Sequence, residues 1–251
     1  MLMRVLPTLI LAGLLLAGWE VGCRLTGVSP LILPAPSGVI RALIVNRAEI
    51  APHAFATLWV AALGFSLSVC VAGLTSIALH FLPWFERGLM PLFVASQTVP
   101  LVALAPLMIL WFGFGVLPKV LLVILVTFFP MLLSLLSGYR TTPRAFLDLL
   151  TSMGAGPWAV FRRARLPSAR AAFLAGLRIS ATYAIVATIF AEYAGARRGL
   201  GIYILTAKNN FRADLVLAAV VISATLTLGL LGLIRLLDRL SAKGPEARHD
   251  A

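Results

Sequence analysis

Charged residues are scarce in this chain of 251 residues. Only 12% of them are Asp, Glu, Lys or Arg, whereas 61% are hydrophobic. A typical soluble domain has roughly 25% charged and about 45–50% apolar residues. A single core of this size cannot hide the excess of apolar side chains. The composition therefore predicts integration into a membrane and excludes an ordinary soluble domain.

Acidic residues are the rarer of the two charged classes, with 9 Asp and Glu against 21 Lys and Arg, for a net charge of +12. In a soluble protein this balance would suggest nucleic acid as the partner. Cytoplasmic loops of membrane proteins also collect Lys and Arg, and no RNA-binding aromatic motif accompanies the charge. We therefore expect no nucleic-acid partner.

Motifs for catalysis, nucleotide binding and metal binding are missing. The only cysteines, Cys23 and Cys70, form no disulfide framework and no Cys/His metal spacing. The chain has no G-x-x-x-x-G-K-[ST] loop to cradle a nucleotide, no H-E-x-x-H and no G-x-S-x-G nucleophile. We expect no catalytic residue, no metal and no cofactor on this chain.

Long apolar runs are abundant. A membrane-spanning helix needs about 20 mostly apolar residues, and six runs meet that requirement, so the sequence predicts an all-α membrane protein with about six transmembrane helices. Pro100 and Pro106 are expected to kink the third span or to make its first half irregular. The expected spans are residues 5–23, 55–82, 89–112, 117–138, 172–194 and 214–236.

Three parts are expected along the chain. Residues 1–53 form an N-terminal anchor helix and an outer interfacial segment, in which Ser37 is expected to cap a short helix. Residues 54–240 form the transmembrane domain, and residues 241–251 form a disordered cytoplasmic tail. Basic residues concentrate in the loop 140–170. Both termini and this loop are therefore predicted to be cytoplasmic.

The basic loop itself predicts two short helices around a turn. Thr142 is expected to cap the first helix, with Pro143 at its first position. An apolar stripe then recurs at helical spacing, and Gly154 follows where a helix ends in a left-handed residue. The stripe consists of Phe146, Leu149, Leu150 and Met153.

The second helix of the loop is expected to start at Gly156-Pro157, with Trp158 on one side, and Pro167 is expected to break the pattern before the fifth span. Two interpretations remain open for this helical pair. It is either an amphipathic hairpin lying on anionic lipid, or a protruding arm whose stripe enters a groove on a partner protein.

The loop resembles the signature of the membrane subunits of bacterial binding-protein-dependent ABC importers, E-A-A-x3-G-x9-I-x-L-P. Asp148-Leu149-Leu150 take the first three positions, Gly154 the glycine, Ala164 the isoleucine and Leu166-Pro167 the end. All spacings fit. The departures are Asp for Glu, two leucines for two alanines and Ala for Ile, so any contact made by the shorter Asp148 side chain is less certain.

The resemblance extends over roughly residues 55–240. The blocks at 98–123, 128–140 and 191–204 look like the nitrate, sulfonate, taurine and bicarbonate branch of this family. The resemblance implies a type I ABC importer fold in a bacterial inner membrane, with two permease subunits that we expect to be a homodimer. It also implies a cytoplasmic ATPase dimer that binds ATP and Mg, and a periplasmic substrate-binding protein.

Coupling to the ATPase is the role that the resemblance implies for the hairpin. The expected movement of the docked hairpins tilts the fourth and fifth spans and switches the pathway between inward-facing and outward-facing states. The expected coupling residues are Phe146, Asp148, Leu149, Leu150, Met153, Gly154, Trp158, Arg162, Arg163, Leu166 and Pro167.

Polar residues elsewhere have two interpretations each. Gln97 and Thr98 either line the pathway or hold helices together. Glu192 is a candidate for the pathway as an ionisable residue near a span end, or it reaches interfacial water or pairs with an arginine nearby. A basic segment follows it and either attracts an anionic substrate or docks the binding protein. Its members are Arg197, Arg198, Lys208 and Arg212.

Other functions remain as alternatives. An ion-coupled secondary transporter would normally show internal repeats and intramembrane carboxylates, and past the first span only Glu192 is an acidic candidate. A lipid-bound scaffold without transport is a further alternative. The substrate is expected to be a small, anionic solute such as a sulfonate, taurine or nitrate, although relatives in this branch also carry pyrimidine-like precursors.

Overall fold

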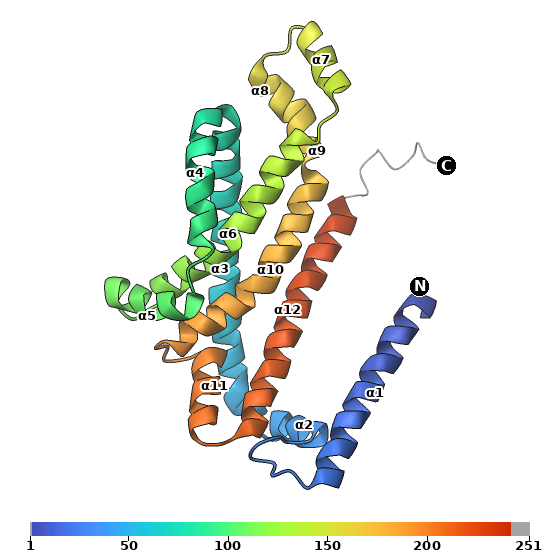
Figure 1. Cartoon of the computed structure of the whole chain (residues 1–251), viewed down its shortest axis with the longest axis vertical. Helices are drawn as coiled ribbons and strands as arrows, with labels where there is room; N and C mark the ends of the chain where they lie inside the picture. The colour runs from blue at the N-terminus through green and yellow to red at the C-terminus, as the bar shows by residue number, and fades with distance from the viewer. Residues whose placement is uncertain (1, 242–251) are drawn as a thin grey trace.

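The computed structural model describes residues 2–241, and this part of the chain is built from helices (Figure 1). Five helices are long and apolar enough to cross a membrane, and a bent pair raises the number to six if it counts as one span. The prediction of an all-α membrane protein with about six spans is confirmed. The helices are α1 (Leu2–Thr26), α2 (Pro36–Val45), α3 (Arg47–Phe81), α4 (Pro83–Ser96), α5 (Leu101–Phe112), α6 (Leu117–Arg140), α7 (Arg144–Ser152), α8 (Pro157–Val160), the π-helical turn η1 (Phe161–Arg165), α9 (Leu166–Ser168), α10 (Arg170–Tyr193), α11 (Leu200–Asn209) and α12 (Ala213–Ser241).

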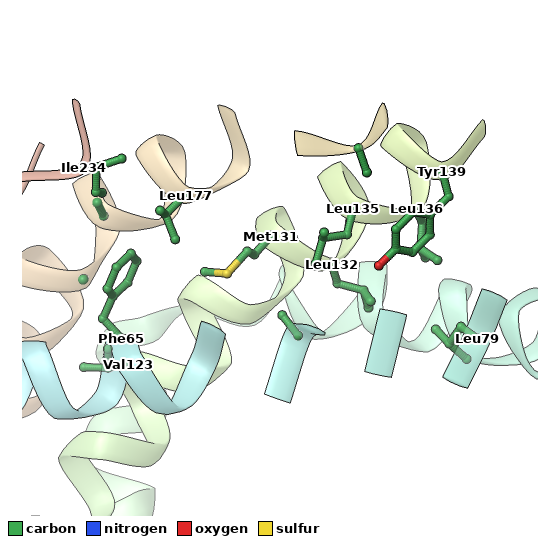
Figure 2. Packing of buried hydrophobic residues seen from close by; sticks show 14 of the residues in the cluster. Phe65, Leu79, Val123, Met131, Leu132, Leu135, Leu136, Tyr139, Leu177 and Ile234 are labelled. Carbon is green, nitrogen blue, oxygen red and sulfur yellow. The ribbon is translucent and has the colours of Figure 1, made fainter. Parts of the chain in front are cut away.

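The core lies where α3, α6 and α10 meet. Figure 2 shows Phe65 and Leu79 of α3 facing the side chains of α6, among them Met131 and Leu132. Leu177 of α10 joins the same cluster. These three helices carry most of the main buried cluster, and we call them the frame.

Small residues allow the backbones of these helices to approach closely. A Cβ atom added to Gly64 would lie 2.7 Å from Val123 Cβ, and one added to Gly176 would lie 2.6 Å from Ser134 Cβ. Membrane helices associate through such close packing, because lipid tails offer no hydrophobic driving force between helices. The frame is therefore held by shape complementarity between small residues and their neighbours.

The expected third span, residues 89–112, is not a single kinked helix. The structure divides it into α4 and α5, which are bent by 101° at the break between Ser96 and Leu101. Pro100 lies at the break with an extended backbone, φ −62° and ψ 121°, and precedes the first residue of α5. Because proline restricts the residue before it to extended conformations, the chain cannot continue as one helix through this point. The expected kink was right in place at Pro100 but too small in extent, whereas Pro106 lies inside α5 without breaking it.

The N-terminal segment contains a helix, α1, that is long and apolar enough to cross a membrane, and a short helix, α2. Ser37 is not the N-cap of α2, because Ala35 holds that position. The backbone N–H and the hydroxyl of Ser37 instead donate hydrogen bonds to Glu20 of α1, at 3.0 and 2.8 Å. The boundary expected between residues 53 and 54 falls inside α3. Residues 242–251 of the expected tail lie outside the described residues.

Short helices lie at two opposite ends of the molecule (Figure 1). Helices α7 and α8 project at one end, and α2 and α11 lie at the opposite end (Figure 1). Ion pairs tie neighbouring helices together near the projecting hairpin: Arg140 at the end of α6 pairs with Glu86 of α4, and Arg178 of α10 lies 2.8 Å from a carboxylate oxygen of Asp238 in α12.

Candidate functional site

Gly154 ends the first helix of the projecting hairpin (residues 142–168), which we call the coupling hairpin after the role that the loop resemblance implies. Its φ is +78°, and its N–H donates to the carbonyl of Thr151 at 2.9 Å. The next N–H, of Ala155, donates to Leu150 at 3.0 Å. This pair of bonds is the Schellman motif, in which a left-handed residue satisfies the last helical carbonyls. The expected left-handed turn at Gly154 is present.

Most of the apolar stripe of α7 is exposed in the described chain. Met153 is 74% exposed, Leu149 56% and Phe146 43%, while Leu150 is half-buried. Asp148 is exposed on the same helix and forms no ion pair among the described residues. A large apolar surface on an arm that projects from the bundle is a candidate interaction surface.

An aromatic cluster fixes the base of the hairpin to the frame. Phe161 is 1% exposed, and its ring centroid lies 5.1 Å from that of Tyr139 in α6 and 5.0 Å from that of His80 in α3. Trp158 stacks on Phe161 at 5.6 Å and remains 57% exposed. Such ring pairs contribute about 0.5–1.5 kcal/mol each beyond burial. The cluster therefore joins the exposed tip to the ends of α3 and α6.

Pro167 was expected to break the helical pattern, but the helix continues through it. The segment from α8 to α10 runs on with only one turn residue, Ala169, and it absorbs the proline through the π-helical turn η1. The N–H of Leu166 bonds to the carbonyl of Phe161, five residues back. Because proline lacks an N–H and clashes with the carbonyl four residues before it, a widened turn next to it accommodates the ring. Arg162 and Arg163 are exposed along this segment.

The start of α7 also differs from the expectation. Pro143 is the N-cap residue, with Arg144 first in the helix. Thr142 is buried, and its hydroxyl donates to the carbonyl of Tyr139 at 3.2 Å. The threonine thus closes the end of α6 instead of capping α7, because its position after the last turn of α6 brings it within reach of that carbonyl.

At the other end of the molecule, Glu192 caps the first turn of α11. Its carboxylate accepts a hydrogen bond from the N–H of Gly201 at 3.0 Å and from the hydroxyl of Thr57 at 2.8 Å. The oxygen of that hydroxyl also accepts a hydrogen bond from the N–H of Leu200 at 2.7 Å, which satisfies a second donor at the start of the helix. His53 Nδ1 lies 3.2 Å from the backbone nitrogen of Gly199. We call His53, Thr57, Glu192, Gly199 and Gly201 the α11 cap cluster.

The burial of Glu192 corrects two expectations. Its side chain is 0% exposed, so it does not reach interfacial water and is not open to a passing solute in this structure. No ion pair joins it to Arg197 or Arg198 within the described chain. Neither Thr57, the hydrogen-bond partner of Glu192, nor His53, which bonds to Gly199, was predicted, because each lies more than 130 residues from its partner and carries no local signal.

Gln97 and Thr98 both lie in the turn between α4 and α5, and the structure separates their surroundings. The side-chain amide of Gln97 donates to the carbonyl of Leu125 in α6 at 3.2 Å. Gln97 lines a groove of about 520 Å³ together with Tyr183 of α10. Thr98 is exposed and bonds back to Ala95, and it is not among the residues that line this groove.

The four cations expected to act together belong to two different places. Arg197 and Arg198 are exposed in the loop before α11 and line one groove, whereas Lys208 and Arg212 line another. The guanidinium of Arg212 donates two hydrogen bonds to Asp214, at 2.9 and 2.8 Å. These bonds raise the pKa of Arg212 and neutralise its charge locally, so Arg212 offers little attraction to a free anion.

Comparisons with known proteins agree with the resemblance of the loop to ABC importer permeases. Residues 64–243 match the family described as binding-protein-dependent transport system inner membrane component. The chain is 35% identical to a formylaminopyrimidine transport permease of Halalkalibacterium halodurans over 90% of this chain and 89% of that protein. It is 33% identical to a taurine transport system permease of Escherichia coli over 92% of this chain and 86% of that protein.

A solved structure shares the fold. The inward-facing MetNI methionine ABC transporter aligns with a TM-score of 0.58 and 12% identity, over 74% of this chain and 95% of the matched chain. The matched family, the permease relatives and the apolar helices agree with the resemblance stated from the loop signature. The chain belongs to the family of inner-membrane components of binding-protein-dependent transport systems, as a multi-pass ABC transporter permease.

Proposed function

We propose that this chain is the permease subunit of an ATP-driven importer and forms the pathway for a small, anionic solute delivered by a periplasmic binding protein. A separate cytoplasmic ATPase dimer binds ATP and Mg and supplies the energy. The observation that carries the proposal is the coupling hairpin: a largely exposed apolar stripe on an arm joined to α6 and α10.

The hairpin is built to pass movement to the transmembrane helices. Trp158 at the exposed tip stacks on the buried ring of Phe161, and the helical segment from α8 continues into α10 through a single turn residue. A push on the tip therefore reaches the frame through packed side chains and helical backbone, which deform little. Closure of the ATPase on ATP would draw two docked hairpins together and tilt α6 and α10.

A second copy of the chain completes the pathway in this proposal. Helix α5 leaves large apolar side chains uncovered, including Leu107, Leu110 and Trp111, which are 39%, 77% and 62% exposed. A homodimer with a two-fold axis would cover such a surface with its own counterpart. Membrane lipid would cover the apolar surface of α1, which the chain leaves unburied.

The proposed orientation follows from the charge and from the two ends of the molecule. The arginine-rich hairpin faces the cytoplasm, in keeping with the excess of Lys and Arg in cytoplasmic loops. The beginning of α1 and the end of α12 are then cytoplasmic as well, and α2 and α11 face the periplasm. Arg197, Arg198 and Lys208 would meet the arriving solute or the binding protein there.

Replacing Gly154 with valine tests the proposal. The φ of +78° disfavours a side chain with a Cβ, at a cost of about 1–2 kcal/mol, and a β-branched residue is a particular outlier there. We expect the turn to reorient α7, so that the purified chain retains less of the ATPase and uptake falls about tenfold. The measurement is co-purification together with uptake into proteoliposomes.

The matched control for this variant is Gly156→Ala, in the same hairpin. The φ of Gly156 is −69°, and a Cβ there would meet nothing within 4 Å. It should keep both ATPase retention and uptake. Normal retention and normal uptake in Gly154→Val would count against the hairpin as the coupling element.

A further inference from the structure

A groove of about 580 Å³ lies beside the start of α11, away from the coupling hairpin. The loop after α10 forms one wall with Arg197 and Arg198, and the beginning of α6 contributes Lys119. Trp59 of α3 and Phe114 contribute two aromatic rings to the lining. The groove therefore brings together three cations and two aromatic rings from four segments of the chain.

The charge in this groove is not balanced by acidic side chains. No Asp or Glu lines it, and none of its three cations forms an ion pair within residues 6–240. Lys119 is half-buried and lies near enough to Glu192 for their charges to interact, but that carboxylate is committed to the α11 cap cluster. The residues that line the groove therefore carry a net positive charge, which favours the binding of an anion.

The aromatic wall is shaped by close packing. A Cβ on Gly195 would lie 2.9 Å from Phe114 Cε1 and 3.2 Å from Ile109 Cδ1. The ring of Phe114 can lie against the loop that carries the arginines because glycine has no side chain. Trp59 and Phe114 remain 59% and 77% exposed, so their faces are open to a ligand in the groove.

We propose that this groove binds an organic anion that has a compact, negatively charged oxygen group and an apolar or aromatic body. Arg197 and Arg198 would donate paired hydrogen bonds to the oxygens, which suits the planar guanidinium. Lys119 would add a point charge, and the two rings would contact the apolar body. This site deepens the proposed function, because it gives the imported anion a place on the permease itself.

The same chemistry occurs in two sources, a free solute and the headgroup of an anionic lipid, and the proposal is for the solute. The test uses the full chain in phosphatidylcholine nanodiscs, titrated with benzenesulfonate and followed by ligand-observed NMR. The variants are Lys119→Gln and the double variant Arg197→Gln with Arg198→Gln. Arg41→Gln is the matched control, because Arg41 is exposed on α2 and does not line the groove.

The expected result is a Kd about tenfold higher for Lys119→Gln, which removes one charge beside the anion, and higher still for the double variant, which removes both guanidinium groups. The control should bind like the unchanged chain. Benzenesulfonamide, which has the same ring and no charge, should bind at least about tenfold more weakly and respond little to the variants. Equal affinity of the unchanged chain and the groove variants for benzenesulfonate would overturn the proposal.

Nanodiscs that contain phosphatidylglycerol separate the two sources. If the affinity of the unchanged chain for benzenesulfonate stays above that of the double variant, the groove binds the solute as proposed. If it falls to that of the double variant, a lipid headgroup occupies the groove and the proposal is overturned. ATP-driven uptake is measured separately on the assembled complex, so failure of the permease function would be distinguished from failure of the groove.

Discussion

Replacing Gly201 with alanine is expected to displace α11 and to destabilise the chain by about 3 kcal/mol. An added Cβ would lie 2.2 Å from the carbonyl oxygen of Ile189 and 2.8 Å from the backbone nitrogen of Tyr193. Both are backbone atoms of α10, so no side-chain rotation relieves the overlap. Moving α11 away would also break the bond from the Gly201 N–H to Glu192 and leave a buried carboxylate short of a donor.

The measurement is the thermal unfolding midpoint of the purified chain in detergent, which we expect to fall by roughly 6 °C or more. Gly73→Ala is the matched control. Gly73 lies within α3, and a Cβ there would meet nothing within 4 Å. The control should keep or raise the midpoint, because alanine is the better helix former by about 1 kcal/mol. Equal midpoints for Gly201→Ala and the unchanged chain would contradict the tight seating of α11 on α10.

Replacing Leu149 with glutamate is expected to abolish assembly with the ATPase while leaving the permease folded. Leu149 is 56% exposed, so the charge costs little in the isolated chain. In a complex that covers the stripe, the same carboxylate would lose its water, which costs several kcal/mol when no partner is present. We therefore expect the affinity for the ATPase to fall at least about a hundredfold.

Thr151→Glu is the control for this change. Thr151 is exposed on the same helix, two positions further along, which places it on the face opposite the stripe at 3.6 residues per turn. It introduces the same charge at a similar distance from the end of α7. Equal loss of ATPase binding in both variants would point to a general effect of charge, and no loss in Leu149→Glu would show that the stripe is not buried by a partner.

Features that depend on local sequence were predictable. The apolar runs located the spans, and the glycine after the stripe of α7 located the left-handed turn, because both signals lie within a few residues of the structure they determine. The same holds for the start of α8 at Gly156-Pro157. These local rules describe the two arms of the coupling hairpin without reference to the rest of the chain.

Features that depend on contacts between distant segments were missed. The carboxylate of Glu192 looked like a pathway residue near a span end, but Thr57 and the first turn of α11 bury it and use it as a cap. The 101° bend between α4 and α5 was signalled by Pro100, but its size depends on distant contacts, because α4 packs on α3 and α5 packs on α6. Likewise the helix through Pro167 continues because Phe161 anchors the widened turn before it.

The central proposal is that an ATPase binds the coupling hairpin, and cross-linking tests this contact most directly. A photoreactive residue at Met153 or Trp158, both exposed at the tip, is activated in membranes that contain the whole transport system. A third probe at Leu14 of α1, which is 65% exposed, reports contact with lipid. We predict that the two tip positions form adducts with the ATPase polypeptide, whereas Leu14 forms adducts with lipid. Phospholipid adducts alone at all three positions would contradict the account.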